Sequence, residues 1–312
     1  MLAVKTLTHK TIIFRREVRL MGNQFEISVV GNDPHWADDR INDAIAEINR
    51  VEKLLSAFND DSNVYEINSN AGIRPVKVDP EIFRLIDRSL QIAELTHGAF
   101  DITYYAAEKN NTEIDNTPVK VGARKTVRTI NYKNVILDAD AQAVFLKQEG
   151  MRIGFGASIK GYAADRARYI LQLQGVSSGV INAGGDLLTW GAQPNDEPWT
   201  ISTADPAQYK APFANVNISN MAIATSVNSE LLTAAINKSQ INVINPKKGF
   251  VVSGIKSVSI LSTSAEFADA MATPVMSIGI NAGLYLINQL NQIACVIVDD
   301  HDRVYTSKDV SI

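Results

Sequence analysis

The chain has 312 residues, of which 46% are hydrophobic and 21% are charged, the proportions of an ordinary globular protein. Its formal net charge of −4 argues against a nucleic-acid or anionic-membrane partner bound through bulk electrostatics. No apolar run reaches the ~18 residues that a membrane-spanning helix needs. The single cysteine, Cys295, excludes an internal disulfide and a cysteine-based zinc site.

The predicted elements begin with two strands, which two helices follow. Residues 11–31 alternate between apolar and polar positions and predict two strands broken near Met21. Residues 33–55 and 79–98 each begin with Asp-Pro and carry apolar residues at helical spacing, which predicts two helices. Residues 105–130 are polar and predict a loop.

The second half of the chain is richer in strands. The predicted elements are strands at 134–138 and 143–148, a helix at 158–175, short strands at 179–182, 186–190, 199–202, 214–219, 221–225, 241–245 and 257–261, helices at 264–279 and 284–290, and a final hairpin at 293–307. Helices near both ends flank a strand-rich middle, which predicts an α+β fold with an antiparallel strand-rich core. Because no linker is visible, we expect residues 1–312 to form one domain or two intimately packed ones.

One carboxylate in an otherwise apolar helical stretch is the first candidate for chemistry. In FADAMATP (267–274), Asp269 and Thr273 stand at positions i and i+4 and therefore on one helix face. Such an oxygen pair suits a hard cation such as Mg²⁺. An Asp that pairs with an Arg or caps a turn is the alternative.

Two glycine-rich segments are the other candidates. RIGFGASIKGYAADRA places Gly154, Gly156 and Gly161 around Lys160 just before a helix, which suggests a phosphate cradle, although it is neither a Walker A motif nor GxGxxG. In INAGGDLLTW, the glycine pair 184–185 permits either a close approach to a ligand or a simple β-turn.

The combination of motifs resembles the ApbE family, the FAD:protein FMN transferases, from about Met21 to about Asp299. The motifs that carry the resemblance occur in this order: LMGNQFEIS, LLSAFNDDSNVYEIN, THGAFDIT, GASIKGYAADRA, INAGGDL, IATS, INVINPKKG and SVSILSTSAEFADAMAT. The resemblance implies an ApbE-like fold, FAD as substrate, a bound Mg²⁺ and an acceptor protein as partner.

The resemblance also implies which residues bind the flavin. In the family the methionine of the MG motif contacts the flavin, which points to Met21. An aromatic residue packs on the isoalloxazine ring, and Phe58 stands at that position. The GAFD segment binds the cofactor, so Ala99, Phe100 and Asp101 are expected to do so here.

The diphosphate and metal positions follow in the same way. The family's loop before KGY holds the pyrophosphate, and here it contributes Gly154 and Lys160, with the backbone oxygen of Ala157 directed at the metal. The Asp and Thr of the ADAxAT helix are the side-chain metal ligands, here Asp269 and Thr273. Lys160 and Asp269 are therefore the expected catalytic residues.

The implied reaction is attack by a Thr or Ser hydroxyl of an acceptor protein on the FMN-side phosphorus of FAD, with AMP leaving. An FAD pyrophosphatase, with water as the nucleophile, is an alternative on the same scaffold. A third reading is a non-catalytic FAD-binding paralogue.

One departure from the family pattern makes the third reading credible, although the transferase remains the leading hypothesis. Many members carry an HxxDPxxG block, whose histidine is a candidate general base. The matching segment here is NVINPKKG, with Asn242 in place of the His and Asn245 in place of the Asp. An amide cannot take a proton near neutral pH. A base would then have to be Asp101, Asp186 or a metal-bound hydroxyl.

The N-terminus carries no recognisable signal peptide. Residues 1–20 include basic residues but no continuous apolar region. An exported protein expressed without its leader would begin in the same way. The family resemblance favours a bacterial, periplasmic and membrane-associated protein.

Overall fold

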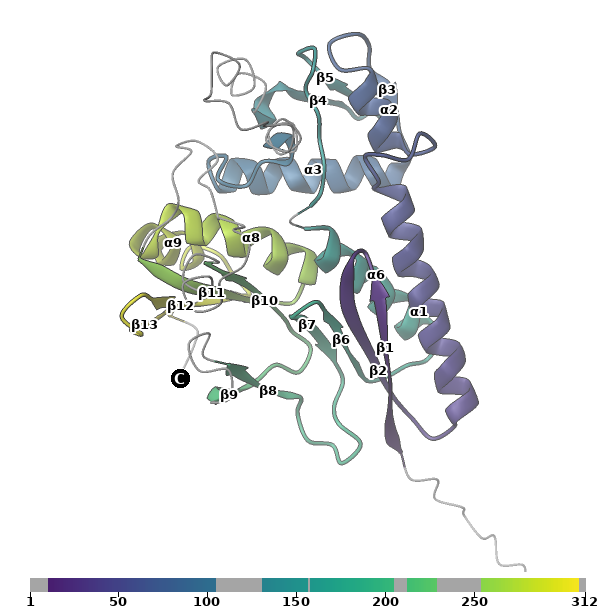
Figure 1. Ribbon diagram of the computed structural model, residues 1–312, viewed down its shortest axis with the longest axis vertical. Coiled ribbons are helices and arrows are strands. Elements are labelled where there is room, and N and C mark those ends of the chain that lie inside the picture. Colours follow the sequence, from purple (N-terminus) through teal and green to yellow (C-terminus); the bar gives the residue numbers. More distant parts are fainter. Residues whose placement is uncertain (1–10, 105–130, 157, 205–211, 229–253, 309–312) are drawn as a thin grey trace, which may run out of the picture.

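The computed structural model describes residues 11–104, 131–156, 158–204, 212–228 and 254–308 (Figure 1). Its α-helices are α1 (Pro34–Leu54), α2 (Asn63–Ser69), α3 (Pro80–Leu95), α6 (Ile159–Leu173), α8 (Ala265–Ile278) and α9 (Ile280–Ile287). Two 3₁₀ turns, η1 (Ile102–Tyr104) and η2 (Tyr132–Asn134), lie between α3 and the next strand. The predicted loop at 105–130 and the predicted strand at 241–245 lie outside the described residues.

Eight strands form one antiparallel sheet in the spatial order β1-β2-β6-β7-β10-β11-β12-β13. They are β1 (Ile12–Leu20), β2 (Asn23–Gly31), β6 (Gly179–Ala183), β7 (Asp186–Trp190), β10 (Ala222–Val227), β11 (Ile255–Ser262), β12 (Ile293–Asp299) and β13 (Val304–Thr306). A second sheet has the order β3-β5-β4, made of β3 (Val76–Lys77), β5 (Ala143–Leu146) and β4 (Val135–Asp138). Strands β8 (Thr200–Ala204) and β9 (Pro212–Asn217) pair separately. The predicted α+β fold is confirmed.

The helix and hairpin ends follow from local chemistry. The Asp33 carboxylate accepts hydrogen bonds from two backbone N–H groups at the start of α1 that have no partner within the helix. The Asp79 carboxylate accepts one such hydrogen bond at the start of α3. A proline at the first position of each helix loses no hydrogen bond there. β1 and β2 are joined at Met21 and Gly22, whose φ angles of 51° and 73° suit a two-residue hairpin turn.

The main core lies between the large sheet and its helices. Helix α1 packs on β1 and β2, α6 on β6 and β7, and α8 on β10 and β11, so these helices cover one face of the sheet (Figure 1). The same buried cluster continues through α3 and the smaller sheet. On the opposite face, a smaller apolar cluster gathers around Trp199 and Ile218. Side-chain alternation explains this division, because Ile223 faces that smaller cluster whereas Ala224 faces the main core.

Ion pairs fix α6 against α1 and α3. The Glu47 carboxylate of α1, which is 9% exposed, accepts hydrogen bonds from Arg50 and Arg166 at 2.8–2.9 Å. The Tyr162 hydroxyl of α6 donates to Glu81 of α3 at 2.5 Å. Partial burial and complete hydrogen bonding make such a network more constraining than isolated surface pairs. The N-terminal turn of α6 is thereby held in place.

None of the helices in the described part of the chain combines the length and the apolar character that crossing a membrane requires.

Candidate functional site

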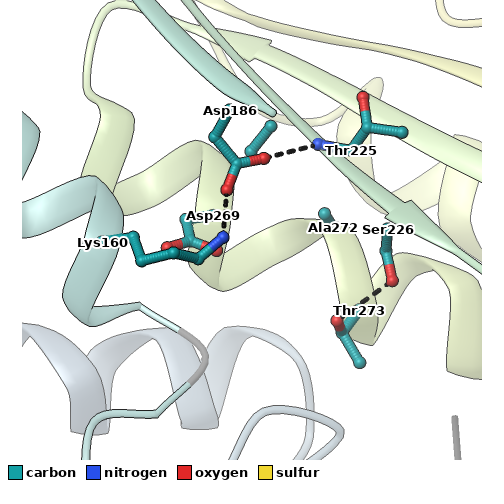
Figure 2. Close-up of a pocket in the computed structure, with 8 residues that line it drawn as sticks. Lys160, Asp186, Thr225, Ser226, Asp269, Ala272 and Thr273 are labelled. Carbon is teal, nitrogen blue, oxygen red and sulfur yellow. Dashed lines mark hydrogen bonds and ion pairs between the residues drawn. The ribbon is translucent and has the colours of Figure 1, made fainter. Parts of the chain in front are cut away.

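A polar pocket of about 210 Å³ opens where α6, α8, β7 and β10 meet (Figure 2). Its lining residues come from all four elements and are Lys160, Asp186, Ala224, Thr225, Ser226, Asp269, Ala272 and Thr273. Three of the residues predicted from the sequence, Lys160, Asp269 and Thr273, are therefore brought together.

Asp269 and Thr273 lie one turn apart on α8 and both line this pocket (Figure 2). The Asp269 Oδ2 atom accepts a hydrogen bond of 3.0 Å from the backbone N–H of Gly161, in the first turn of α6. The positive end of the α6 dipole therefore faces the carboxylate and favours its charged form. The Thr273 hydroxyl lies 3.2 Å from the Ser226 hydroxyl of β10.

Close packing between α6 and α8 sets this arrangement. A Cβ atom on Gly161 would lie 2.2 Å from the Ala265 carbonyl oxygen, so only glycine permits the two helices to approach this closely. One turn later, Asp165 of α6 accepts hydrogen bonds of 2.9 Å from the Ser264 hydroxyl and the Glu266 N–H. A side chain of α6 thus caps the N-terminus of α8 and fixes the register of the two helices.

Lys160 and Asp186 form an ion pair within the same pocket. The Lys160 Nζ atom lies 2.6 Å from Asp186 Oδ2, and the two side chains are 23% and 12% exposed. The other oxygen of Asp186 accepts a 3.0 Å hydrogen bond from the backbone N–H of Thr225. The pocket thus holds one cation and two carboxylates, Asp186 and Asp269.

The electrostatics of the pocket leave Asp269 short of positive charge. Burial, followed by the proximity of Asp186, raises the pKa of Asp269 to about 7, against the opposing effects of Lys160 and the Gly161 N–H. For Lys160, burial alone would lower the pKa, but Asp186 and Asp269 outweigh it and the net shift is upward. Lys160 is therefore charged at neutral pH, whereas Asp269 would gain from a further cation.

The donor chemistry fits a hard divalent cation. Asp269 and Thr273 present a carboxylate and a hydroxyl oxygen, the ligand types that Mg²⁺ prefers. Throughout the described ranges, no three His, Cys, Asp or Glu side chains cluster closely enough to hold a metal ion. Mg²⁺ is commonly bound through one or two carboxylates and takes further ligands from substrate phosphates and water. The predicted backbone ligand Ala157 lies outside the described residues.

The other residues predicted to bind the flavin do not line this pocket. Met21 forms the β1–β2 turn. This turn lies beside the Gly184 turn, as shown by the 2.9 Å hydrogen bond that the Gly184 N–H donates to Gln24 O. Phe58 lies between α1 and α2 and is 70% exposed. Gly154 precedes α6, and its N–H donates to Ile102 O at 3.0 Å, which joins this loop to the segment that follows α3.

The GAFD segment is tied firmly into the fold. Phe100 is 6% exposed and belongs to the main core, and the Ala99 N–H donates to Thr96 O. The Asp101 carboxylate accepts hydrogen bonds from the N–H groups of Thr103 and Tyr132 at 2.8 and 2.9 Å. This segment therefore has a structural role. Its contact with the flavin remains a prediction.

Sequence reasoning left parts of the pocket unassigned. The sequence presents Asp186 only as a candidate base. Its ion pair with Lys160 joins residues 26 positions apart, and no local sequence pattern predicts such a contact. Thr225 and Ser226 belong to the IATS motif and line the pocket, and two consecutive hydroxyl residues in an otherwise apolar strand are the sequence signal for them. The glycine pair 184–185 forms the tight β6–β7 turn, with φ angles of +70° and +105°. Asn242 and Asn245 lie outside the described residues.

Comparisons with known proteins agree with the family resemblance seen in the sequence. The sequence profile of the ApbE family matches residues 21–297. An FAD:protein FMN transferase of Klebsiella pneumoniae is 29% identical over 265 residues, covering 83% of this chain and 82% of its own. The corresponding protein of Treponema pallidum is 26% identical, covering 84% of this chain and 78% of its own.

Solved structures agree as well. The crystal structure of the ApbE protein of Thermotoga maritima superposes with a TM-score of 0.82 at 24% identity, covering 95% of this chain and 97% of its own. The flavin transferase ApbE of Vibrio cholerae has a TM-score of 0.79 at 19% identity, covering 96% of this chain and 98% of its own. A sequence profile that matches nearly the whole chain and a shared fold lead to one conclusion: this protein is a member of the ApbE family.

Proposed function

We propose that the protein transfers FMN from FAD to a Thr or Ser hydroxyl of an acceptor protein, with Mg²⁺ bound and AMP released. The relatives from Klebsiella pneumoniae and Treponema pallidum are named FAD:protein FMN transferases. The observation that carries the proposal is the partly buried Asp269 carboxylate, whose pKa is raised and which lies beside Thr273 and Lys160 in one polar pocket. A buried carboxylate with a raised pKa is costly unless a cation or a strong donor compensates it.

The diphosphate of FAD would lie in this pocket, with the flavin extending from it. Lys160 supplies a charged donor to the phosphate oxygens, and the first turn of α6 directs its positive end to the same place. The residues proposed to hold the remainder of the molecule are Met21, Phe58, Ala99, Phe100, Asp101 and Gly154. Asp269, Thr273 and the Ala157 carbonyl would hold Mg²⁺.

The reaction forms one phosphoester and breaks one diphosphate bond. The acceptor hydroxyl oxygen bonds to the FMN-side phosphorus while the bridging P–O bond breaks, AMP departs with the bridging oxygen, and the hydroxyl proton is released. When bound, Mg²⁺ neutralises negative charge that develops on the phosphate oxygens. Lys160, whose pKa is raised by Asp186 and Asp269, donates hydrogen bonds to the same oxygens as a charged group.

Both carboxylates that are candidate bases, Asp101 and Asp186, are already engaged. Both oxygens of Asp101 accept hydrogen bonds from Thr103 and Tyr132. Both oxygens of Asp186 are likewise engaged, with Lys160 and with the N–H of Thr225. These contacts favour roles in holding the structure for both residues over removal of a proton.

The test is incubation with FAD and Mg²⁺ in a protein extract from a bacterium that lacks its own family member. Mass spectrometry should find Thr- or Ser-containing peptides that carry FMN, together with one AMP per FMN attached. A parallel incubation with a chelator should yield neither. Free FMN with AMP would instead show an FAD pyrophosphatase, and intact FAD would show a flavin-binding protein without this activity.

A further inference from the structure

The Asp186 carboxylate joins two elements of the pocket, because each of its oxygens has its own partner (Figure 2). Asp186 Oδ2 accepts a hydrogen bond from Lys160 Nζ of α6 at 2.6 Å. Asp186 Oδ1 accepts one from the Thr225 N–H of β10 at 3.0 Å. With only 12% of the Asp186 side chain exposed, this bridge is largely shielded from water.

The position of Asp186 is set by the backbone on both sides. It is the first residue of β7, directly after the Gly184–Gly185 turn, whose positive φ angles few other residues would adopt. The pairing of β7 with β10 ends at Leu187 and Ile223, whereas β10 continues to Val227. The Asp186 side chain takes the place of the missing ladder carbonyl by accepting the N–H of Thr225.

We propose that Asp186 is a positioning residue that holds the Lys160 ammonium against the FAD diphosphate, an inference that rests on the proposed function. A lysine side chain has four flexible torsions and loses substantial entropy when it is ordered. The bridge from β10 through Asp186 orders Lys160 before FAD arrives. The ammonium is then ready for the phosphate oxygens whose charge increases during transfer.

This role differs measurably from that of a general base. A general base would act on the acceptor hydroxyl independently of Lys160, whereas a positioning residue acts only through Lys160. The effects of removing the two residues should therefore be coupled, and a double-mutant cycle measures that coupling.

The cycle compares the wild type with Asp186→Asn, Lys160→Met and the double variant. The asparagine keeps an oxygen for the Thr225 N–H but removes the charge that holds Lys160. We expect Asp186→Asn to slow AMP release at saturating FAD on the order of tenfold, with a smaller change in the Kd for FAD. In the Lys160→Met background, the same substitution should have no further effect. The proposal would be overturned if the rate reductions of the two single variants multiply in the double variant. An unchanged rate of AMP release in Asp186→Asn would also overturn it.

A second measurement follows Lys160 itself and needs no turnover. In protein labelled with ¹⁵N-lysine, an ordered ammonium gives a resolved NMR signal, which is assigned to Lys160 by its absence in Lys160→Met. The signal should shift on addition of FAD and disappear in Asp186→Asn. The matched control is Asp140→Asn, which removes one exposed carboxylate in the β4–β5 turn, distant in sequence from Asp186. This variant should leave the Lys160 signal unchanged.

The two proposals fail in different ways. A wild-type protein that forms neither AMP nor FMN-bearing protein contradicts the proposed function, and the ammonium signal still reports how Lys160 is held. A Lys160 signal that persists unchanged in Asp186→Asn contradicts the positioning role, whatever the activity. Thermal unfolding of every variant confirms that the fold is intact before either measurement is interpreted.

Discussion

Gly161 packs so closely against Ala265 that an added Cβ atom would lie 2.2 Å from the Ala265 carbonyl oxygen. The same Cβ would lie 2.9 Å from the Cβ of Asp269. The Gly161 N–H also donates to the Asp269 carboxylate. One glycine therefore brings α6 against α8 and places a helix N-terminus next to the proposed metal ligand.

Gly161→Ala should destabilise the protein and weaken metal binding. Alanine favours a helix over glycine by about 1 kcal/mol, but here the two nearest obstructing atoms belong to the Ala265 backbone and cannot rotate away. We expect a net loss of about 1–3 kcal/mol in the free energy of unfolding, the usual cost of overpacking. Chemical denaturation without added metal measures it. Gly156→Ala is the control, since among the described residues other than its chain neighbours no atom lies within 4 Å of a Cβ there, and its stability should change little.

Asp269→Ala should abolish Mg²⁺-dependent turnover, because the proposed site loses its only charged ligand. The rate of AMP release at saturating FAD should fall at least tenfold, and added Mg²⁺ should no longer raise it. Mg²⁺ affinity, measured calorimetrically without FAD, should fall in parallel. A variant that keeps the wild-type response to Mg²⁺ would refute the assignment of Asp269 as a ligand.

The metal-free protein should become less stable as pH rises towards neutrality. The pKa of Asp269 is raised from 3.8 to about 7 in the folded state by burial and then by Asp186. Between these values the folded protein keeps a proton that the unfolded chain has released, so the free energy of unfolding falls with rising pH. The loss due to this group is at most about 4 kcal/mol and is complete above the folded-state pKa.

Asp269→Asn isolates this effect, since asparagine resembles the protonated acid and does not titrate. Unfolding measured in chelator at pH 5 and pH 8 should show the variant gaining stability relative to the wild type as pH rises. Equal pH dependence of the two proteins would mean that Asp269 is ionised throughout. Added Mg²⁺ should remove the difference, because a cation favours the charged carboxylate.

Phe58→Ala should weaken flavin binding without lowering stability. The Phe58 side chain is 70% exposed, so little apolar burial is lost when it is truncated. If the ring stacks on the isoalloxazine, the Kd for FAD should increase by a factor that corresponds to about 1 kcal/mol or slightly more. Ile73→Ala, at a residue that is 71% exposed, is the control. Equal FAD affinity in the two variants would remove Phe58 from the site.

Much of the fold could be predicted from local patterns. The Asp-Pro starts of α1 and α3, the break at Met21 and the final hairpin all depend on residues adjacent in sequence. Capping, turn conformation and hydrophobic periodicity act over one to four residues, so a single sequence reveals them. The order of strands in the large sheet depends on pairing between distant segments, such as β2 with β6, and local patterns do not encode it.

The candidate site divides in the same way. The sequence alone determined that Asp269 and Thr273 share a helix face, since helical geometry relates residues four apart, and the family motifs directed attention to Lys160. Only the tertiary structure decided that Asp186 pairs with Lys160 and that Ser226 meets Thr273. Those contacts arise where α6, α8, β7 and β10 pack together, and the pKa of Asp269 follows from the burial and charges that this packing creates.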